Sequence, residues 1–299
     1  DKFDICNGIS SGGNNEQFYR YHWEVEAHDV YNGSNEETYN WAYIHKGGPY
    51  KKWYGDIWLV FEWGHHGKKL KVLKSKYPSI RYGYENYYFK EGLAFTGGSS
   101  KSVAVRYQPK NCIFERAGKS RFAKSVGDEY WSLLAFMNSM LCSYLMDSLN
   151  PTVSFQSGDI ERIPYVPLTN VYTSLLVKQN IDITKKILSY SLIEPNYKES
   201  PIHPNIDSLQ CIKNFYTVEN ALNSEIFLNE AILNRDVFDS FNLNNDDRHM
   251  VLEKEGIPVG NLSVSNEARQ AYLQWLNSDA NEFKPTQELI DHINNLEEN

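Results

Sequence analysis

The sequence predicts an α+β fold, in which a mixed β-rich domain at residues 1–165 precedes a helical domain at residues 166–299. Short apolar runs separated by Gly, Pro and Asn clusters fill the first part, as strands joined by turns require. Apolar residues at spacings of three and four dominate the second part, as in amphipathic helices. The overall composition, 41% hydrophobic and 23% charged, is that of a globular chain long enough for two domains.

The first part is expected to contain strands near residues 57–61 and 102–107, where apolar and β-branched residues are concentrated. Residues 129–149 change to helical spacing, which predicts a helix that buries one face. Asn150 and Pro151 should end that helix, because the residue before a proline avoids the helical conformation.

The second part should be mostly helical. Residues 175–192 and 212–241 have helical spacing, and residues 250–262 suggest a short strand-turn unit around Gly256-Ile257-Pro258. Pro285 and Thr286 are typical of a helix start with a capping hydroxyl.

Charge is distributed unevenly along the chain. Residues 1–165 carry 20 Lys and Arg against 18 Asp and Glu, whereas residues 166–299 carry 10 against 20. Within the first part, residues 46–124 contain 17 basic residues and five acidic ones, and the predicted strands and loops would carry this charge. Such a surplus indicates a surface for a polyanion, although a solvated basic surface without a partner is the plainer interpretation.

The cysteines favour a reducing cytoplasm, because Cys6, Cys112, Cys142 and Cys211 lie far apart and form no C-x-x-C pair. The sequence has no apolar run long enough for a membrane span and no signal-peptide layout, so we expect no membrane association. It begins at Asp1 rather than Met, which leads us to expect that it is part of a longer chain.

Several motifs follow one another in a fixed order. Gly13–Val25 reads GNNEQFYRYHWEV, Gly47–Gly55 reads GGPYKKWYG, and Tyr87–Thr96 reads YYFKEGLAFT. Further on come LLAFMNS at 133–139, NPT at 150–152, GDIERIP at 158–164 and EAILNR at 230–235. In this order they resemble the region downstream of the catalytic domain in PglX-type adenine-specific methyltransferases of BREX phage-defence systems and in type IIG restriction-modification relatives.

The resemblance covers most of the chain and departs from the family pattern at two places. Gly12 stands where the family has Thr, and Val105 interrupts the family's A-R-Y motif. The run from residue 133 to 164 is also comparable to the end of target-recognition domains in type I specificity subunits. The resemblance implies a target-recognition domain at 1–165 that reads double-stranded DNA, followed by an acidic helical domain at 166–299.

The resemblance and the basic segment together suggest residues that contact DNA. Lysines would bind phosphates and set the salt dependence, arginines would bond guanine edges, and a serine loop would let the backbone approach a phosphate. The phosphate candidates are Lys51, Lys52, Lys68, Lys69, Lys71, Lys101, Lys110 and Lys119. The base-edge candidates are Arg81, Arg106, Arg116 and Arg121, and the loop candidates are Ser99 and Ser100.

The chemistry of the catalytic domain is absent from this sequence. Adenine methylation needs a [DNS]-P-P-[YFW] loop that holds the flipped base, and the chain has no Pro-Pro dipeptide. Gly12-Gly13 and Gly97-Gly98 are not followed by a helical pattern, so no S-adenosylmethionine turn is expected. We therefore expect no catalytic residue and no cofactor in this chain, and S-adenosylmethionine in the parent enzyme.

Metal-dependent chemistry is not expected either. The spacing of Glu115 and Lys119 does not fit a nuclease, and Asp159 and Glu161 lack a partner. His65 and His66 would point to opposite faces of a strand, which favours solvent exposure over a metal site.

The aromatic residues and the acidic helices of the chain each allow more than one role. Trp53, Tyr54, Trp58 and Trp63 are expected in the core rather than as stacking rings for bases. The acidic helices would be repelled by DNA, so they are expected to pack on the missing methyltransferase domain or subunit, or on other defence-system proteins. A protein-interaction scaffold of the same defence complex is the alternative to DNA recognition, and a complete small enzyme is disfavoured by the absent motifs.

Overall fold

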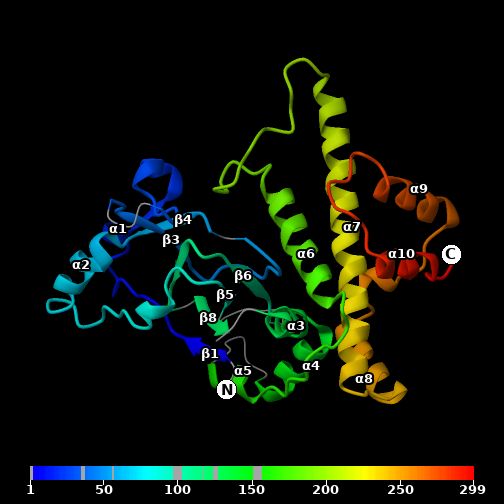
Figure 1. Ribbon diagram of the computed structural model, residues 1–299, viewed down its shortest axis with the longest axis horizontal. Coiled ribbons are helices and arrows are strands. Elements are labelled where there is room, and N and C mark those ends of the chain that lie inside the picture. The colour runs from blue at the N-terminus through cyan, green and yellow to red at the C-terminus, as the bar shows by residue number, and fades with distance from the viewer. Residues whose placement is uncertain are drawn as a thin grey trace. The chain divides into compact units, whose positions relative to one another are not determined.

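The computed structural model has an α+β fold, as the sequence predicts, with strands in its N-terminal part and a helical C-terminal part (Figure 1). The structure describes residues 3–34, 38–55, 57–96, 103–116, 118–123, 127–150 and 157–299.

The chain forms two compact units. The first comprises residues 1–126 with 152–161 and 193–195, and the second comprises 127–151, 162–192 and 196–299. We call them the β unit and the helical unit. Helices α3 (Asp128–Met137) and α4 (Met140–Leu149) belong to the helical unit, although they precede residue 165.

The described residues of the β unit form two four-stranded sheets. One sheet is antiparallel throughout, in the order β1 (Phe3–Cys6), β8 (Gly118–Ala123), β5 (Gly92–Thr96), β6 (Val105–Gln108). The other has the order β2 (Tyr19–Tyr21), β4 (Leu59–Glu62), β3 (Trp41–His45), β7 (Cys112–Phe114). Its β3 and β7 run parallel, so β7 forms one edge of the sheet although it is far from β3 in the sequence. Strands predicted near 57–61 and 102–107 are thus confirmed with shifted ends.

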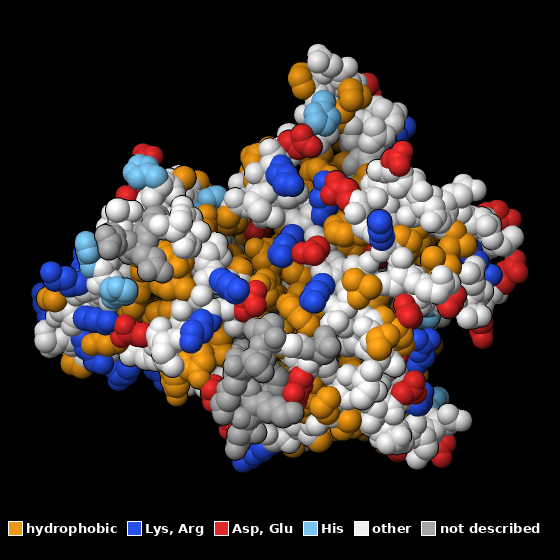
Figure 2. Space-filling view, viewed as in Figure 1, with side chains coloured by type: hydrophobic (Ala, Val, Ile, Leu, Met, Phe, Trp, Pro, Cys, Tyr) orange, Lys and Arg blue, Asp and Glu red, His pale blue; other side chains and the backbone are white. Residues whose placement is uncertain are grey.

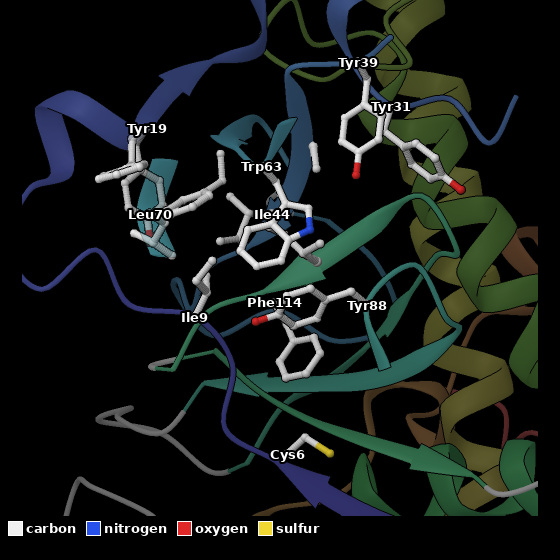
Figure 3. Packing of buried hydrophobic residues seen from close by; sticks show 14 of the residues in the cluster. Cys6, Ile9, Tyr19, Tyr31, Tyr39, Ile44, Trp63, Leu70, Tyr88 and Phe114 are labelled. Atoms are coloured by element: carbon white, nitrogen blue, oxygen red, sulfur yellow. The ribbon is translucent and has the colours of Figure 1, made fainter. Parts of the chain in front are cut away.

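Aromatic side chains form much of the core of the β unit. Alternate residues of the second sheet, such as Phe61, Ala42 and Ile44, point to one face and are fully buried. Trp63, Tyr88 and Phe114 pack in the same cluster (Figure 3). Ring centroids of Trp63 and Tyr88 lie 5.1 Å apart, edge to face, a favoured geometry for aromatic pairs.

The other helices of the β unit are short, and the last of them ends one residue beyond the unit. They are α1 (Asn15–Phe18), η1 (His22–Glu24), η2 (Ala27–Asp29), α2 (Gly64–Leu73), η3 (Glu85–Tyr87) and α5 (Ser157–Arg162).

The helix predicted over 129–149 is broken into α3 and α4. The break occurs at Asn138 and Ser139, where the Ser139 hydroxyl donates to the Phe136 carbonyl at 2.7 Å. The same oxygen accepts from the Cys142 amide at 3.2 Å and so caps α4. A serine that bonds its own backbone competes with the helix, which explains the interruption inside a continuous apolar pattern.

The rest of the helical unit is organised around one long helix, α7 (Ser208–Ser240), with α6 (Thr173–Leu188) running beside it (Figure 1). Helices over 175–192 and 212–241 are therefore confirmed. Thr286 accepts from the Leu289 amide at 3.1 Å and caps the next predicted helix. The other elements are α8 (Asn245–Glu255), η4 (Val259–Asn261), α9 (Asn266–Leu276) and α10 (Gln287–Asn294).

The strand-turn unit predicted at 250–262 is wrong. Helix α8 occupies residues up to Glu255 instead. Asn244 caps the start of this helix, because its side-chain oxygen accepts a hydrogen bond from the Asp247 amide at 2.9 Å. The chain then turns at Gly256, which has a φ of 90° that glycine adopts readily.

Gly260 allows η4 to approach α7 closely. A Cβ at this position would lie 2.2 Å from the Phe227 carbonyl oxygen and 2.7 Å from the Leu228 Cα, both backbone atoms of α7. Gly260→Ala should therefore lower the free energy of unfolding by about 2 kcal/mol. Thermal unfolding followed by circular dichroism measures this, with Gly83→Ala as control because its Cβ would meet nothing within 4 Å. Equal stability of the two variants would contradict the close approach.

Candidate nucleic-acid interface

The basic segment contains a helix, so the prediction that only strands and loops carry its charge is wrong. Residues 65–67 adopt left-handed backbone conformations before α2 continues. Gly67 is required there, since its φ is 73° and a Cβ would lie 2.3 Å from the Trp63 ring. Beyond this turn Leu70 is fully buried, Lys68 and Lys69 are exposed, and Lys71 is half-buried.

His65 and His66 lie in this left-handed turn rather than on a strand, and both are exposed. Their exposure agrees with the sequence interpretation. Within the described ranges, no group of three or more His, Cys, Asp or Glu side chains is placed to hold a metal ion.

Five lysines follow one another between residues 68 and 76, and we call them the lysine ribbon: Lys68, Lys69 and Lys76 are exposed, and Lys71 and Lys74 are half-buried. From residue 63 to residue 84 the sequence has these five lysines and Arg81 but no acidic residue. Figure 2 shows Lys and Arg side chains gathered where Figure 1 places α2 and the chain that follows it. Lys74 and Lys76 were not among the predicted contacts, although they continue the same basic run.

Two lysines of the ribbon are neutralised by carboxylates. Lys69 Nζ lies 2.7 Å from a Glu62 oxygen, and Lys71 Nζ lies 2.6 Å from a Glu85 oxygen. Lys68, Lys74 and Lys76 make no ion pair with any residue that the structure describes. Lys74 Nζ lies 4.5 Å from the centroid of the Tyr82 ring, which holds the ammonium at the surface. These three lysines carry the uncompensated charge of the ribbon.

Arg81 and Arg116, both exposed, are brought together by the segment Ile9-Ser10. The Ser10 amide donates to the Arg81 carbonyl at 2.8 Å, and the Arg116 amide donates to the Ile9 carbonyl at 2.9 Å. Neighbouring extended segments lie about 4.8 Å apart, so the two arginine Cα atoms are roughly 10 Å apart. Ile9 pairs with Glu115 in parallel, so the next residues, Ser10 and Arg116, are neighbours whose side chains point to the same side. Ser10 also pairs with Arg81, so the side chains of Arg81 and Arg116 leave the backbone on one face.

The other two predicted arginines do not join this surface. Arg106 on β6 is 1% exposed and lies opposite Ala94, so its guanidinium does not reach a ligand at the surface in this structure. Arg121 is half-buried on the central strand β8, between Ile5 and Leu93. The strand registers place the two arginines on opposite faces of this sheet, Arg106 with Ala94 and Arg121 with Leu93, which the composition of the segment could not reveal.

The remaining predicted contacts are scattered or undescribed. Lys51 and Lys52 are half-buried beside β6, where Trp53 bridges to Arg106, and Lys110 is exposed between β6 and β7. Ser99, Ser100, Lys101 and the side chain of Lys119 lie outside the described residues.

Trp53 and Trp63 are buried at 3% and 2% exposure, which confirms them as core residues, while Tyr54 and Trp58 are partly buried. The sequence interpretation missed a different aromatic pair. Tyr21 and Trp23 are both exposed and stack with ring centroids 4.6 Å apart. Their i, i+2 spacing in a short polar stretch is the only sequence signal for a shared face.

Comparison with known proteins gives partial matches. The chain is 29% identical over 185 residues to the adenine-specific methyltransferase PglX of Lacticaseibacillus casei (strain Zhang), covering 58% of the chain. It is 27% identical over 180 residues to the adenine-specific methyltransferase BrxX of Escherichia coli O9:H4 (strain HS), covering 60% of the chain. Part of the chain is therefore similar to two adenine-specific methyltransferases. No protein-family profile matches it.

The matched region spans only 14% of the length of each of these relatives. The turn at Gly12-Gly13 does not fit an S-adenosylmethionine-binding turn, and Gly97-Gly98 lies outside the described residues. The turn at Gly12-Gly13 leads into the four-residue helix α1, and a Cβ at Gly12 would lie 2.6 Å from the Ile80 amide. Backbone therefore fills the space beside Gly12 that part of the cofactor would need, and no methyl-transfer step is derived for this chain.

The thiols and helices add two findings. Cys6, Cys112, Cys142 and Cys211 are buried and form no disulfide, and burial raises the pKa of the Cys6 thiol to about 12. No helix within the described ranges is long and apolar enough to cross a membrane.

Proposed function

We propose that the β unit is a DNA target-recognition module of a BREX-type adenine-specific methyltransferase. The observation that carries the proposal is the basic character of the lysine ribbon together with the exposed Arg81 and Arg116. The relationship to the PglX and BrxX enzymes supports it, because such enzymes act on adenine by name. The methyltransferase domain and its S-adenosylmethionine would lie outside this chain.

The two parts of the surface would do different work. Ammonium groups on a flexible stem neutralise phosphates without reading sequence, which suits the ribbon. Guanidinium groups bond two acceptors of one guanine, which suits the pair Arg81 and Arg116. Arg81 Nη1 donates to the carbonyls of Pro78 and Ile80, the latter at 3.0 Å, which steadies the side chain and leaves the N–H groups of Nη2 and Nε for a base.

A scaffold role is the second candidate, and it concerns the helical unit. The start of α7 exposes Leu209, Ile212 and Tyr216 at spacings of three and four, with exposed fractions of 59%, 40% and 54%. An apolar stripe beside an acidic composition suits a protein partner better than DNA. The methyltransferase domain or another defence-system protein would be that partner.

Titration of labelled random-sequence duplex, followed by fluorescence anisotropy, tests DNA recognition. We expect binding at low salt that weakens steeply as salt rises. If the three unpaired lysines each neutralise one phosphate, log K should fall against log salt with a slope of about −2.7.

Absence of binding at low salt would contradict DNA recognition by this chain and favour the scaffold role. The same titration with a full-length enzyme would then show whether the methyltransferase domain is needed to complete the DNA site. Binding with a shallow slope would contradict the assignment of the lysine ribbon to phosphates.

A further inference from the structure

A cavity lined by aromatic rings opens beside the lysine ribbon. Its volume is about 240 Å³, and its walls are formed by the rings of Tyr31, Tyr39, Trp63, Tyr88 and Phe89. Glu85 and His66, both exposed, lie at its mouth. The volume equals that of roughly eight liquid waters, which is room for one planar base.

The rings form two groups that face the cavity. Tyr31 lies 4.1 Å from Phe89 and 5.0 Å from Tyr39, measured between ring centroids. Trp63 and Tyr88 form the second group, and Figure 3 shows the nitrogen-bearing edge of Trp63 on the side of Tyr31 and Tyr39. Flat walls with a polar rim suit a planar heteroaromatic ligand.

Aromatic cages also bind methylated ammonium groups, so the charge at the mouth decides between the two ligands. Glu85 is the only carboxylate among the cavity's lining residues, and Lys71 lies 2.6 Å from it. The Lys71 ammonium also lies 5.3 Å from the Trp63 ring centroid. Because this carboxylate is already paired with Lys71, a bound cation would find no free counter-charge among the lining residues, whereas a neutral base needs none.

We propose that this aromatic cavity binds a single unpaired nucleobase of the DNA held by the lysine ribbon. The inference rests on the proposed DNA recognition and extends it from phosphates to a base taken out of the stack. Lys68 on α2, which makes no ion pair with a described residue, would hold a flanking phosphate, and the Glu85 oxygen that is not bonded to Lys71 would accept a hydrogen bond from an exocyclic amine of the base.

A duplex with one bulged 2-aminopurine tests the inference, since its unpaired base carries an exocyclic amine and fluoresces. We expect the bulged duplex to bind the 299-residue chain about tenfold more tightly than the fully paired duplex at the same salt. The bound 2-aminopurine should also be protected from quenching by acrylamide, which requires no variant of the protein.

Phe89→Gly should abolish both the preference and the protection. Glycine suits this position because Phe89 has a φ of 60°, and the change removes one wall of the cavity. Trp23→Ala is the matched control, since it removes an exposed ring that does not line the cavity.

The outcomes separate the two proposals. Equal affinity for both duplexes, with the base open to acrylamide, would overturn the base site and leave DNA recognition standing. Binding of neither duplex at low salt would overturn both. Equal loss of preference in Phe89→Gly and Trp23→Ala would place the base outside this cavity and overturn the inference.

Discussion

Replacing Lys68, Lys74 and Lys76 together with alanine should weaken duplex binding several hundred-fold near 0.1 M salt. Each phosphate contact contributes about −0.9 to the slope of log K against log salt, so three contacts contribute roughly −2.7. Extrapolated from about 1 M salt, where these contacts contribute little, this slope corresponds to about 500-fold at 0.1 M. Anisotropy titrations at four or five salt concentrations measure both quantities for the variant and the wild type.

These three lysines are chosen because they make no ion pair within the described ranges, unlike Lys69 and Lys71. A control must remove the same charge elsewhere. Lys198, Lys213 and Lys284 are exposed in the helical unit, and their joint replacement with alanine changes the net charge equally. Similar weakening in both triple variants would mean that net charge, rather than the ribbon, determines binding.

Local patterns in the sequence were sufficient to predict much of the fold. The helix over 212–241 and the cap at Thr286 depend on spacing and on one hydroxyl, and both are present. The break at Ser139 was missed because the apolar spacing continues through it. Helix α2 was missed because a left-handed turn at His65 and His66 precedes only one fully buried leucine.

The candidate site was harder to predict because long-range pairing builds it. Composition located the basic segment, and the lysine ribbon lies within it. Nothing local indicates that Arg81 and Arg116 flank Ile9-Ser10, or that Arg106 points inward. Strand alternation decides which arginines reach the surface, and its phase is set by partners far along the chain.

Glu225→Gln should stabilise the helical unit above neutral pH. Glu225 lies on α7 with 0% exposure, and neither carboxylate oxygen has a hydrogen-bond partner among the described residues. Burial raises the pKa of this carboxyl from 4.5 to about 7, and its charge helps to raise the pKa of Tyr272. The folded chain must therefore bury a charge that the unfolded chain exposes to water.

The raised pKa of Glu225 determines whether the free energy of unfolding rises or falls with pH. Below about pH 4.5 the carboxyl is protonated in both states, so ionisation removes no stability there. Between pH 4.5 and 7 the unfolded state loses this proton while the folded state keeps it, so the free energy of unfolding falls by about 3 kcal/mol and stays at that lower value above pH 7. Glutamine cannot ionise, so the stability difference between variant and wild type should grow by about 3 kcal/mol between pH 4.5 and 8.5.

Urea unfolding followed by circular dichroism at several pH values measures this difference. The cost of burying the glutamine amide does not depend on pH, so it cancels when the two ends of the pH range are compared. Glu253→Gln is the control, because water solvates that exposed carboxylate in both states. A difference that stays flat for Glu225→Gln would show that water or another group reaches the carboxylate, and that α7 packs less tightly around residue 225 than the structure shows.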